Sequence, residues 1–157
     1  MSALDNATLQ GEEKVKALEA IYKQIYEWGL AMPDVDPLPL HFGLNDFYKT
    51  GETEFWIANE DDFGYCGKFL FVFDGQTCPY HQHKVKHETF FVLKGKISMN
   101  CNGEIKEMKT GDKLVMPTGV AHSFTGIGPA LILEVSMPSI PQDSFFADKN
   151  IGDNGIL

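Results

Sequence analysis

Arginine is absent from this 157-residue sequence, and all thirteen of its basic residues are lysines. Because the planar guanidinium group matches phosphates and guanine edges best, its absence argues against a nucleic-acid-binding surface. The net charge of −9 points the same way, since an acidic chain is repelled by DNA and by anionic lipid. The expected partner is therefore a small molecule or another copy of the chain.

Cysteine is scarce, and long apolar runs are missing. The three cysteines are an odd number without a CxxC pair, a pattern typical of reduced thiols, and so they predict a cytoplasmic protein: Cys66, Cys78 and Cys101. Residues 1–14 are polar and acidic, which does not fit a signal peptide. No stretch approaches the length needed to cross a membrane. The length and the hydrophobic fraction of 43 % predict a single globular domain.

One amphipathic helix is predicted over residues 11–30. Its apolar residues recur at spacings of three to five: Val15, Leu18, Ile21, Tyr22, Ile25 and Leu30. Three prolines follow as an extended connector: Pro33, Pro37 and Pro39. We expect the apolar stripe to pack on the protein's own barrel or on a dimer mate, although a membrane-surface or partner helix is the alternative.

From residue 54 onward the pattern changes to short strands separated by turns. Residues 55–57, 69–73 and 131–137 are β-rich, and Asn102-Gly103 between residues 97–101 and 104–106 is a strong hairpin signal. Short strands with regular turns predict an all-β sandwich or barrel. We therefore expect residues 1–40 to form the helix and connector, and residues 41–157 to form the barrel with a C-terminal tail.

Three histidines and a glutamate lie among these strands as a candidate metal site. His81 and His83 are two residues apart, so on a strand both side chains leave the same face. Glu88 begins the next predicted strand, and His122 follows a Pro-Thr-Gly turn. Three imidazoles and one carboxylate suit Mn²⁺, Fe²⁺, Zn²⁺, Ni²⁺ or Co²⁺. Four protein ligands around an octahedral ion would leave two positions for a chelating substrate. His87 fits no ligand position.

These residues lie in two segments that resemble the motifs of the cupin superfamily. The first reads Gly75-x5-His81-x-His83-x4-Glu88-x6-Gly95. The second reads Gly111-x5-Pro117-x-Gly119-x2-His122 and departs from the family only at its last position, where Gly126 replaces an asparagine. The resemblance implies a double-stranded β-helix (jelly-roll) barrel with an N-terminal helix, and it implies a metal held by His81, His83, Glu88 and His122.

Segments outside the motifs resemble D-lyxose ketol-isomerases. The similar stretches are residues 66–79, which lead into the histidines, and residues 133–137, 143–148 and 151–152 near the C-terminus. By that resemblance, Lys68 and Glu134 would be the acid–base or polarising residues beside the metal. Strand alternation independently places both charges on faces shared with apolar residues, where each needs a partner. A purely structural Lys68–Glu134 salt bridge is the alternative.

The leading functional prediction is a metal-dependent aldose–ketose isomerase that acts on a small unphosphorylated sugar, with Mn²⁺ as the expected metal. Lack of arginine disfavours a phosphosugar, although Lys84 and Lys86 could contact an anion. Two alternatives use the same ligands: a non-haem iron oxygenase or cupin lyase, and a non-catalytic metal- or sugar-binding barrel. A homodimer is expected because the phenylalanines at 69, 71 and 73 give their strand a second apolar face that needs covering.

Overall fold

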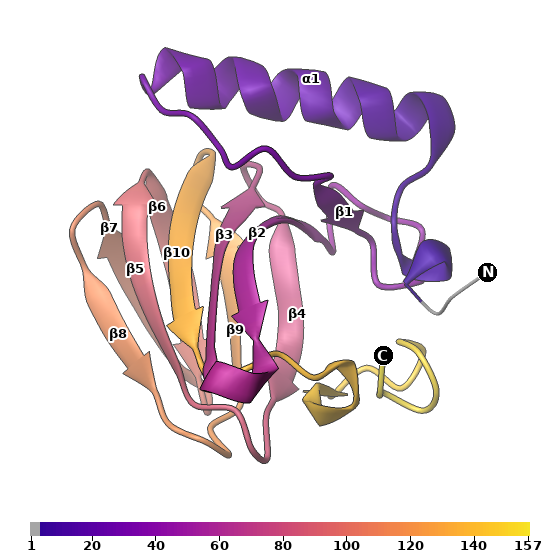
Figure 1. Ribbon diagram of the computed structural model, residues 1–157, viewed down its shortest axis with the longest axis vertical. Coiled ribbons are helices and arrows are strands. Elements are labelled where there is room, and N and C mark those ends of the chain that lie inside the picture. The colour runs from indigo at the N-terminus through magenta and orange to yellow at the C-terminus, as the bar shows by residue number, and fades with distance from the viewer. Residues whose placement is uncertain (1–3) are drawn as a thin grey trace.

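The computed structural model describes residues 4–157 and contains two antiparallel sheets packed face to face (Figure 1). One sheet has the strand order β1-β2-β3-β10-β5-β8. Its strands are β1 Leu38–Leu40, β2 Glu52–Glu60, β3 Tyr65–Val72, β10 Ala130–Ser136, β5 Glu88–Lys94 and β8 Lys113–Met116. The other sheet has the order β11-β4-β9-β6-β7. Its strands are β11 Phe145–Phe146, β4 Thr77–Gln82, β9 His122–Gly126, β6 Lys96–Cys101 and β7 Glu104–Lys109. The predicted β architecture is confirmed.

The main core lies between the inner faces of the two sheets. Alternation along each strand sends every second side chain inward. Leu70 and Val72 of β3 pack there with Ile132 of β10, Val92 of β5 and Phe124 of β9, and all five are 2 % exposed or less. Lys68 and Glu134 occupy the same inner face further along β3 and β10, where they pair directly across the strands. The predicted assignment of their faces is confirmed.

The helix α1 spans Gly11–Glu27 and ends three residues before its predicted limit. The helix ends here because Gly29 has a left-handed φ of 70°, a conformation that cannot continue a right-handed α-helix. The Gly29 and Leu30 amides then donate to the carbonyls of Tyr26 and Ile25, which satisfies the last turn. Within residues 4–157, no helix is long and apolar enough to span a membrane.

The helix packs on the outer face of the larger sheet, across one end of the barrel (Figure 1). Ile21 and Ile25 contact the cluster formed by Phe55, Phe71 and Leu131, all five of which are nearly inaccessible to solvent. Packing on the protein's own barrel is therefore confirmed. Because α1 covers much of the phenylalanine face of β3, that face no longer requires a second copy, and the homodimer stays a prediction.

Two turns carry sequence signals that the backbone explains. Asn102 and Gly103 have φ values of 50° and 88° and connect β6 to β7 as predicted, in the paired left-handed conformations of a tight hairpin. Gly126, which departs from the family pattern, ends β9 where a Cβ atom would overlap the carbonyl oxygen of Phe73. Its amide and carbonyl bond to Gln76 and Gly75, so this close approach of two backbones requires glycine.

Candidate metal centre and acid–base pocket

The three predicted histidines converge inside one end of the barrel. His81 of β4 pairs directly with His122 of β9, and His83 follows two residues after His81. Their ring centroids lie 4.5 Å (His81–His122), 4.9 Å (His81–His83) and 5.9 Å (His83–His122) apart. A candidate ligand atom from each ring lies within 4.8 Å of the others. The β4–β9 register also shifts between Cys78 and His81, an irregularity of the kind that re-aims side chains near functional sites.

Each imidazole is fixed by a hydrogen bond between its Nδ1 and a backbone carbonyl. The distances are 2.7 Å from His81 to Pro79, 2.9 Å from His83 to Asp143 and 3.0 Å from His122 to Val120. A carbonyl only accepts, so each Nδ1 carries the proton and each Nε2 keeps its lone pair. This tautomer is the one in which a histidine binds a metal through Nε2.

Glu88 completes the candidate ligand set. Its Oε2 lies 3.3 Å from Nε2 of His122 and 3.5 Å from Nε2 of His83. Those three atoms are buried and have no hydrogen-bond partner among residues 4–157. Buried polar atoms rarely remain unpaired, since each one costs free energy. Three orphaned lone-pair atoms around one point fit a divalent cation, so the chemistry of the donor set suits the metal that the motifs imply.

The electrostatic state of these residues also suits metal binding. Burial, with the neighbouring His122 and His83 rings, lowers the pKa of His81 well below its usual value, so this imidazole is neutral. The Lys86 ammonium, 2.6 Å from Oε1 of Glu88, favours the ionised form of this carboxylate. The set therefore offers a neutral nitrogen at His81 and an ionised carboxylate at Glu88.

Lys86 connects this ligand set to Glu134. Its ammonium lies 2.6 Å from Oε1 of Glu88 and 3.1 Å from Oε1 of Glu134, and all three side chains are buried. Ser136 Oγ also donates to Oε1 of Glu134 at 3.0 Å. Glu134 is thus held beside Glu88 through a lysine of the β4–β5 loop that was expected only to contact an anion.

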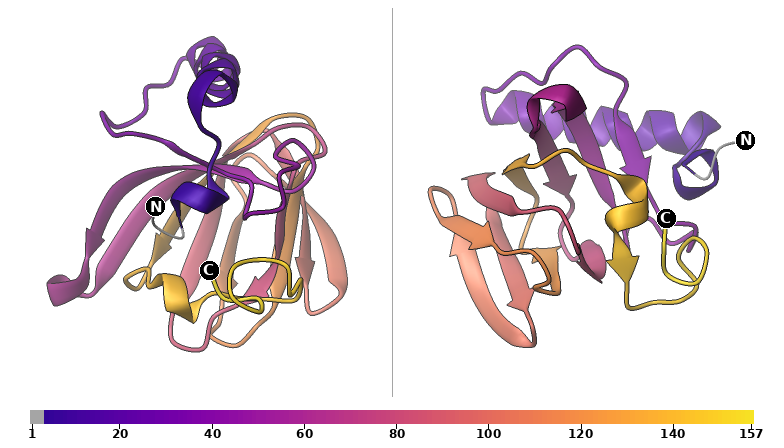
Figure 2. Two further views of the ribbon diagram at one scale, coloured as in Figure 1. Left: turned by 90° about the vertical axis from the view of Figure 1, so that its right-hand side faces the viewer. Right: turned by 60° about the horizontal axis from the view of Figure 1, so that its bottom comes forward.

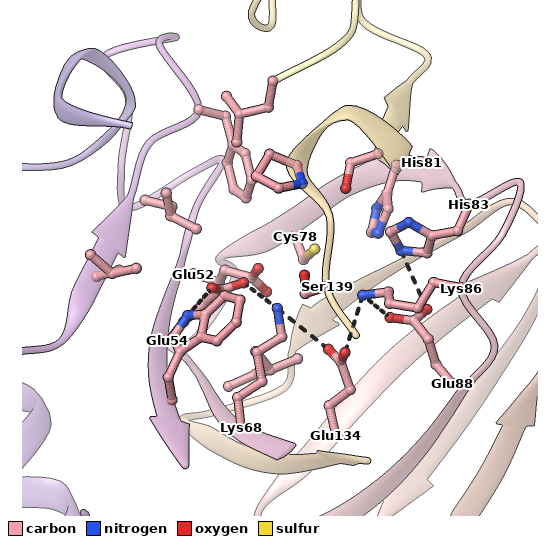
Figure 3. Close-up of a pocket in the computed structure, with 18 of the residues that line it drawn as sticks. Glu52, Glu54, Lys68, Cys78, His81, His83, Lys86, Glu88, Glu134 and Ser139 are labelled. Carbon is pink, nitrogen blue, oxygen red and sulfur yellow. Dashed lines mark hydrogen bonds and ion pairs between the residues drawn. The ribbon is translucent and has the colours of Figure 1, made fainter. Parts of the chain in front are cut away.

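Lys68 lies on the other side of Glu134 and extends the row of charges (Figure 3). Its ammonium is 3.8 Å from Oε2 of Glu134 but 2.8 Å from Oε1 of Glu54. Burial alone would lower its pKa, but Glu134, Glu54 and Glu52 together raise it well above the usual value. The Lys68–Glu134 pair is therefore part of a larger network in which Glu54 is the nearer partner of Lys68.

A cavity of about 200 Å³ runs alongside this network. Its wall includes Lys68, Lys86 and the carboxylates paired with them. The chain beyond β10 contributes Ser139, Pro141, Ser144, Phe146 and Leu157. Leu4, Leu38 and Phe42 add apolar surface from the N-terminal part of the chain. The volume is below the range of roughly 300–1,000 Å³ common for drug-sized ligands, so the cavity suits a small molecule.

Asp143, in the short helix η3 (Pro141–Asp143), holds the β4–β5 loop in place. Its carboxylate accepts hydrogen bonds from the backbone amides of Lys84, Val85 and Lys86 at 2.9–3.2 Å. Its own carbonyl is the acceptor for His83. One buried residue of the C-terminal tail therefore fixes both the loop that carries Lys86 and the orientation of a candidate ligand.

Asp143→Ala is expected to lower the free energy of unfolding by about 2–4 kcal/mol, because three loop amides lose a charged acceptor. The affinity for a divalent metal should fall as well, since the loop follows His83 directly. Thermal denaturation and a metal titration measure the two effects. Asp153→Ala, which removes an exposed aspartate of the same tail, is the matched control. Equal stability and metal affinity in the two variants would contradict the anchoring role.

The remaining candidates fall outside the pocket or were missed. His87 is exposed, and Lys84 lies over the ring of Phe145 rather than in the cavity. Glu52 and Glu54 line the cavity but were not predicted as site residues, because carboxylates at alternate positions of a strand are typical of a solvent-facing side. Their only sequence signal is indirect. The neighbouring strands are apolar, so the face of β2 that carries the two carboxylates is expected to be buried against them.

Comparison with known proteins agrees with this geometry. The family model described as "Cupin domain" matches residues 69–136, which include all four candidate ligands and Glu134 but not Lys68. The matched region covers the central part of the chain, and all four candidate ligands lie within it.

Two curated relatives extend the comparison. A D-lyxose/D-mannose isomerase of Thermosediminibacter oceani is 27 % identical over 172 aligned residues, covering 89 % of this chain and 94 % of the relative. A quercetin 2,3-dioxygenase of Bacillus subtilis is 38 % identical over only 50 residues, which are 32 % of this chain and 15 % of that protein. The similarity to the isomerase therefore extends well beyond residues 69–136.

Among solved structures, the L-ribose isomerase of Cellulomonas parahominis has a TM-score of 0.75. The alignment covers 96 % of this chain and 97 % of that one at 16 % sequence identity. At this identity the likeness establishes the fold. It covers the barrel together with the α1 and tail regions that Figure 2 shows around it.

Proposed function

We propose that this protein is a divalent-metal-dependent aldose–ketose isomerase that acts on a small unphosphorylated sugar. The observation that carries the proposal is the position of Glu134, a carboxylate held one lysine away from the candidate metal ligand Glu88. The relative named D-lyxose/D-mannose isomerase supports the same reaction class. Among residues 4–157, the two lysines that line the cavity are both paired with carboxylates, so neither is free to bind a phosphate.

His81, His83, Glu88 and His122 would hold the metal, which would polarise the sugar carbonyl and acidify the adjacent C–H bond. Glu134 then removes the proton from C2 of the aldose, giving an enediol, and returns it to C1 while a proton passes from O2 to O1. Oε1 of Glu134 already accepts from Lys86 and Ser136, so Oε2, which lies 3.8 Å from the Lys68 ammonium, is the oxygen assigned to take the proton. Lys86 and Lys68 stabilise negative charge that develops on the substrate oxygens.

A panel of aldoses and ketoses in deuterated water tests this proposal. D-lyxose, D-mannose and L-ribose come first, with the protein loaded in turn with Mn²⁺, Fe²⁺, Zn²⁺, Ni²⁺ and Co²⁺. We expect Mn²⁺ to support interconversion, with solvent deuterium incorporated next to the carbonyl. Absence of turnover across the panel with every metal would contradict the isomerase and favour a binding protein.

The local similarity to a dioxygenase supports an oxygenase as the second candidate. Four protein ligands of the same types would serve Fe²⁺ equally well. Oxygen uptake by the Fe²⁺-loaded protein, measured with an oxygen electrode, separates the two reactions. The expected homodimer and cytoplasmic location stay predictions.

A further inference from the structure

Glu52 is a buried carboxyl group in the cavity wall that the proposed reaction does not use. It begins β2, and alternation places Glu52, Glu54 and Trp56 on the inner side of that strand. Glu52 is 5 % exposed and lines the cavity. Its Oε2 is fully buried and has no hydrogen-bond partner among residues 4–157.

The neighbouring Glu54 shows how a carboxylate on this strand is normally satisfied. Its Oε1 accepts from Lys68 at 2.8 Å and its Oε2 accepts from the Trp56 indole at 2.7 Å. Glu52 interacts through a hydrogen bond with the thiol of Cys78, but its Oε2 has no hydrogen-bond partner among residues 4–157. An unpaired polar atom in a buried position costs free energy, and such atoms concentrate where a ligand completes the bonding.

The charge state of Glu52 suits an uncharged ligand group. Burial, followed by the negative charge of Glu54, raises its pKa to about 8, with Lys68 and Cys78 opposing the rise and Glu134 adding to it. Near neutral pH the group is therefore a carboxylic acid, which both donates and accepts a hydrogen bond. A hydroxyl group offers the complementary donor and acceptor.

Glu52 also lies at the opposite side of the cavity from the histidines. Figure 3 shows Lys68 and Glu134 between Glu52 and His83, and the ion pairs from Glu54 to Lys68 and on to Glu134 follow the same line. A ligand bound at the histidines and passing Glu134 would therefore reach Glu52 with its far end. In an open-chain sugar, that end carries hydroxyl groups.

We propose that Glu52 binds a hydroxyl group at the far end of the open-chain sugar and so makes the pocket selective for sugar chain length. This inference rests on the proposed function, since it takes the carbonyl end to lie at the histidines. It identifies a specificity-determining residue outside the cupin motifs, contributed by a strand that precedes the matched cupin domain.

Unreactive sugar alcohols test this proposal without turnover. Calorimetry on Mn²⁺-loaded protein compares D-arabinitol, the five-carbon alcohol derived from D-lyxose, with four-carbon erythritol. The parent protein should bind the five-carbon alcohol about 3- to 10-fold more tightly, the effect of one net hydrogen bond. Glu52→Leu should lose this preference. Glu52→Gln, which keeps a donor and an acceptor, should retain it, and Glu60→Leu at the exposed end of the same strand should behave as the parent.

A Glu52→Leu protein that keeps the preference would overturn the proposal. If that variant does not fold, Glu52→Ala replaces it in the same comparison. A parent that isomerises sugars but binds both alcohols equally would overturn this inference and leave the isomerase intact. A parent that neither isomerises sugars nor binds either alcohol would instead overturn the proposed function, and the inference with it.

Discussion

Glu134→Gln is expected to lower isomerase turnover by roughly two to four orders of magnitude, the usual contribution of a general base. Glutamine keeps the size of the side chain but lacks the basic oxygen that would take the proton. Deuterium exchange at the carbon beside the carbonyl should fall in parallel with turnover. Both quantities are measured on the same metal-loaded protein.

The structure also predicts that Glu134→Gln folds. Lys86 keeps Glu88 at 2.6 Å and Lys68 keeps Glu54 at 2.8 Å, so neither ammonium is left without a carboxylate. Metal content and melting temperature should stay near those of the parent. Glu107→Gln on the exposed strand β7 is the matched control. A Glu134→Gln protein that is destabilised yet fully active would retire the proton-transfer role.

Replacing a candidate ligand should remove the metal. Loss of a residue that only orients a ligand typically costs 10- to 100-fold in affinity, so loss of the ligand itself should cost roughly 100-fold or more. We expect His81→Ala, His83→Ala and His122→Ala to be purified without stoichiometric metal. Metal analysis after dialysis, followed by titration with Mn²⁺, measures the loss.

His87→Ala supplies the control for these variants, because His87 is exposed although it directly precedes Glu88 in the sequence. Its metal content should equal that of the parent. Stoichiometric metal in two of the three ligand variants would exclude the assigned site. Metal loss in His87→Ala would instead show that the first motif had been aligned wrongly.

Part of the candidate ligand set could be predicted because its geometry is encoded locally. Strand alternation alone places His81 and His83 on the same face. Glu88 begins the next strand, after a single short loop. Glu134 and Lys68 were also placed on the correct inner face, since apolar neighbours on both strands fix the register. Each of these predictions needed only the period of a strand or the spacing of a motif.

The rest of the pocket depends on contacts between distant segments. Asp143 lies in a tail whose sequence gives no sign that its carboxylate will cap the loop from Lys84 to Lys86. Glu54 pairs with Lys68 because β2 lies beside β3, a sheet order that strand patterns alone do not determine. Lys86 is buried where the tail contacts its loop. Because the sequence does not reveal that contact, the sequence alone suggests a surface cation.

The bond between His83 and the Asp143 carbonyl joins residues 60 positions apart, and this has a consequence for folding kinetics. Forming a contact of such long range first costs the entropy of closing a long loop, and the favourable free energy of the contact comes only afterwards. Such contacts therefore form late in folding. The unfolded chain is therefore expected to hold no assembled ligand set, and a divalent ion would bind only after both sheets have closed. Added metal should slow unfolding while leaving the refolding rate nearly unchanged.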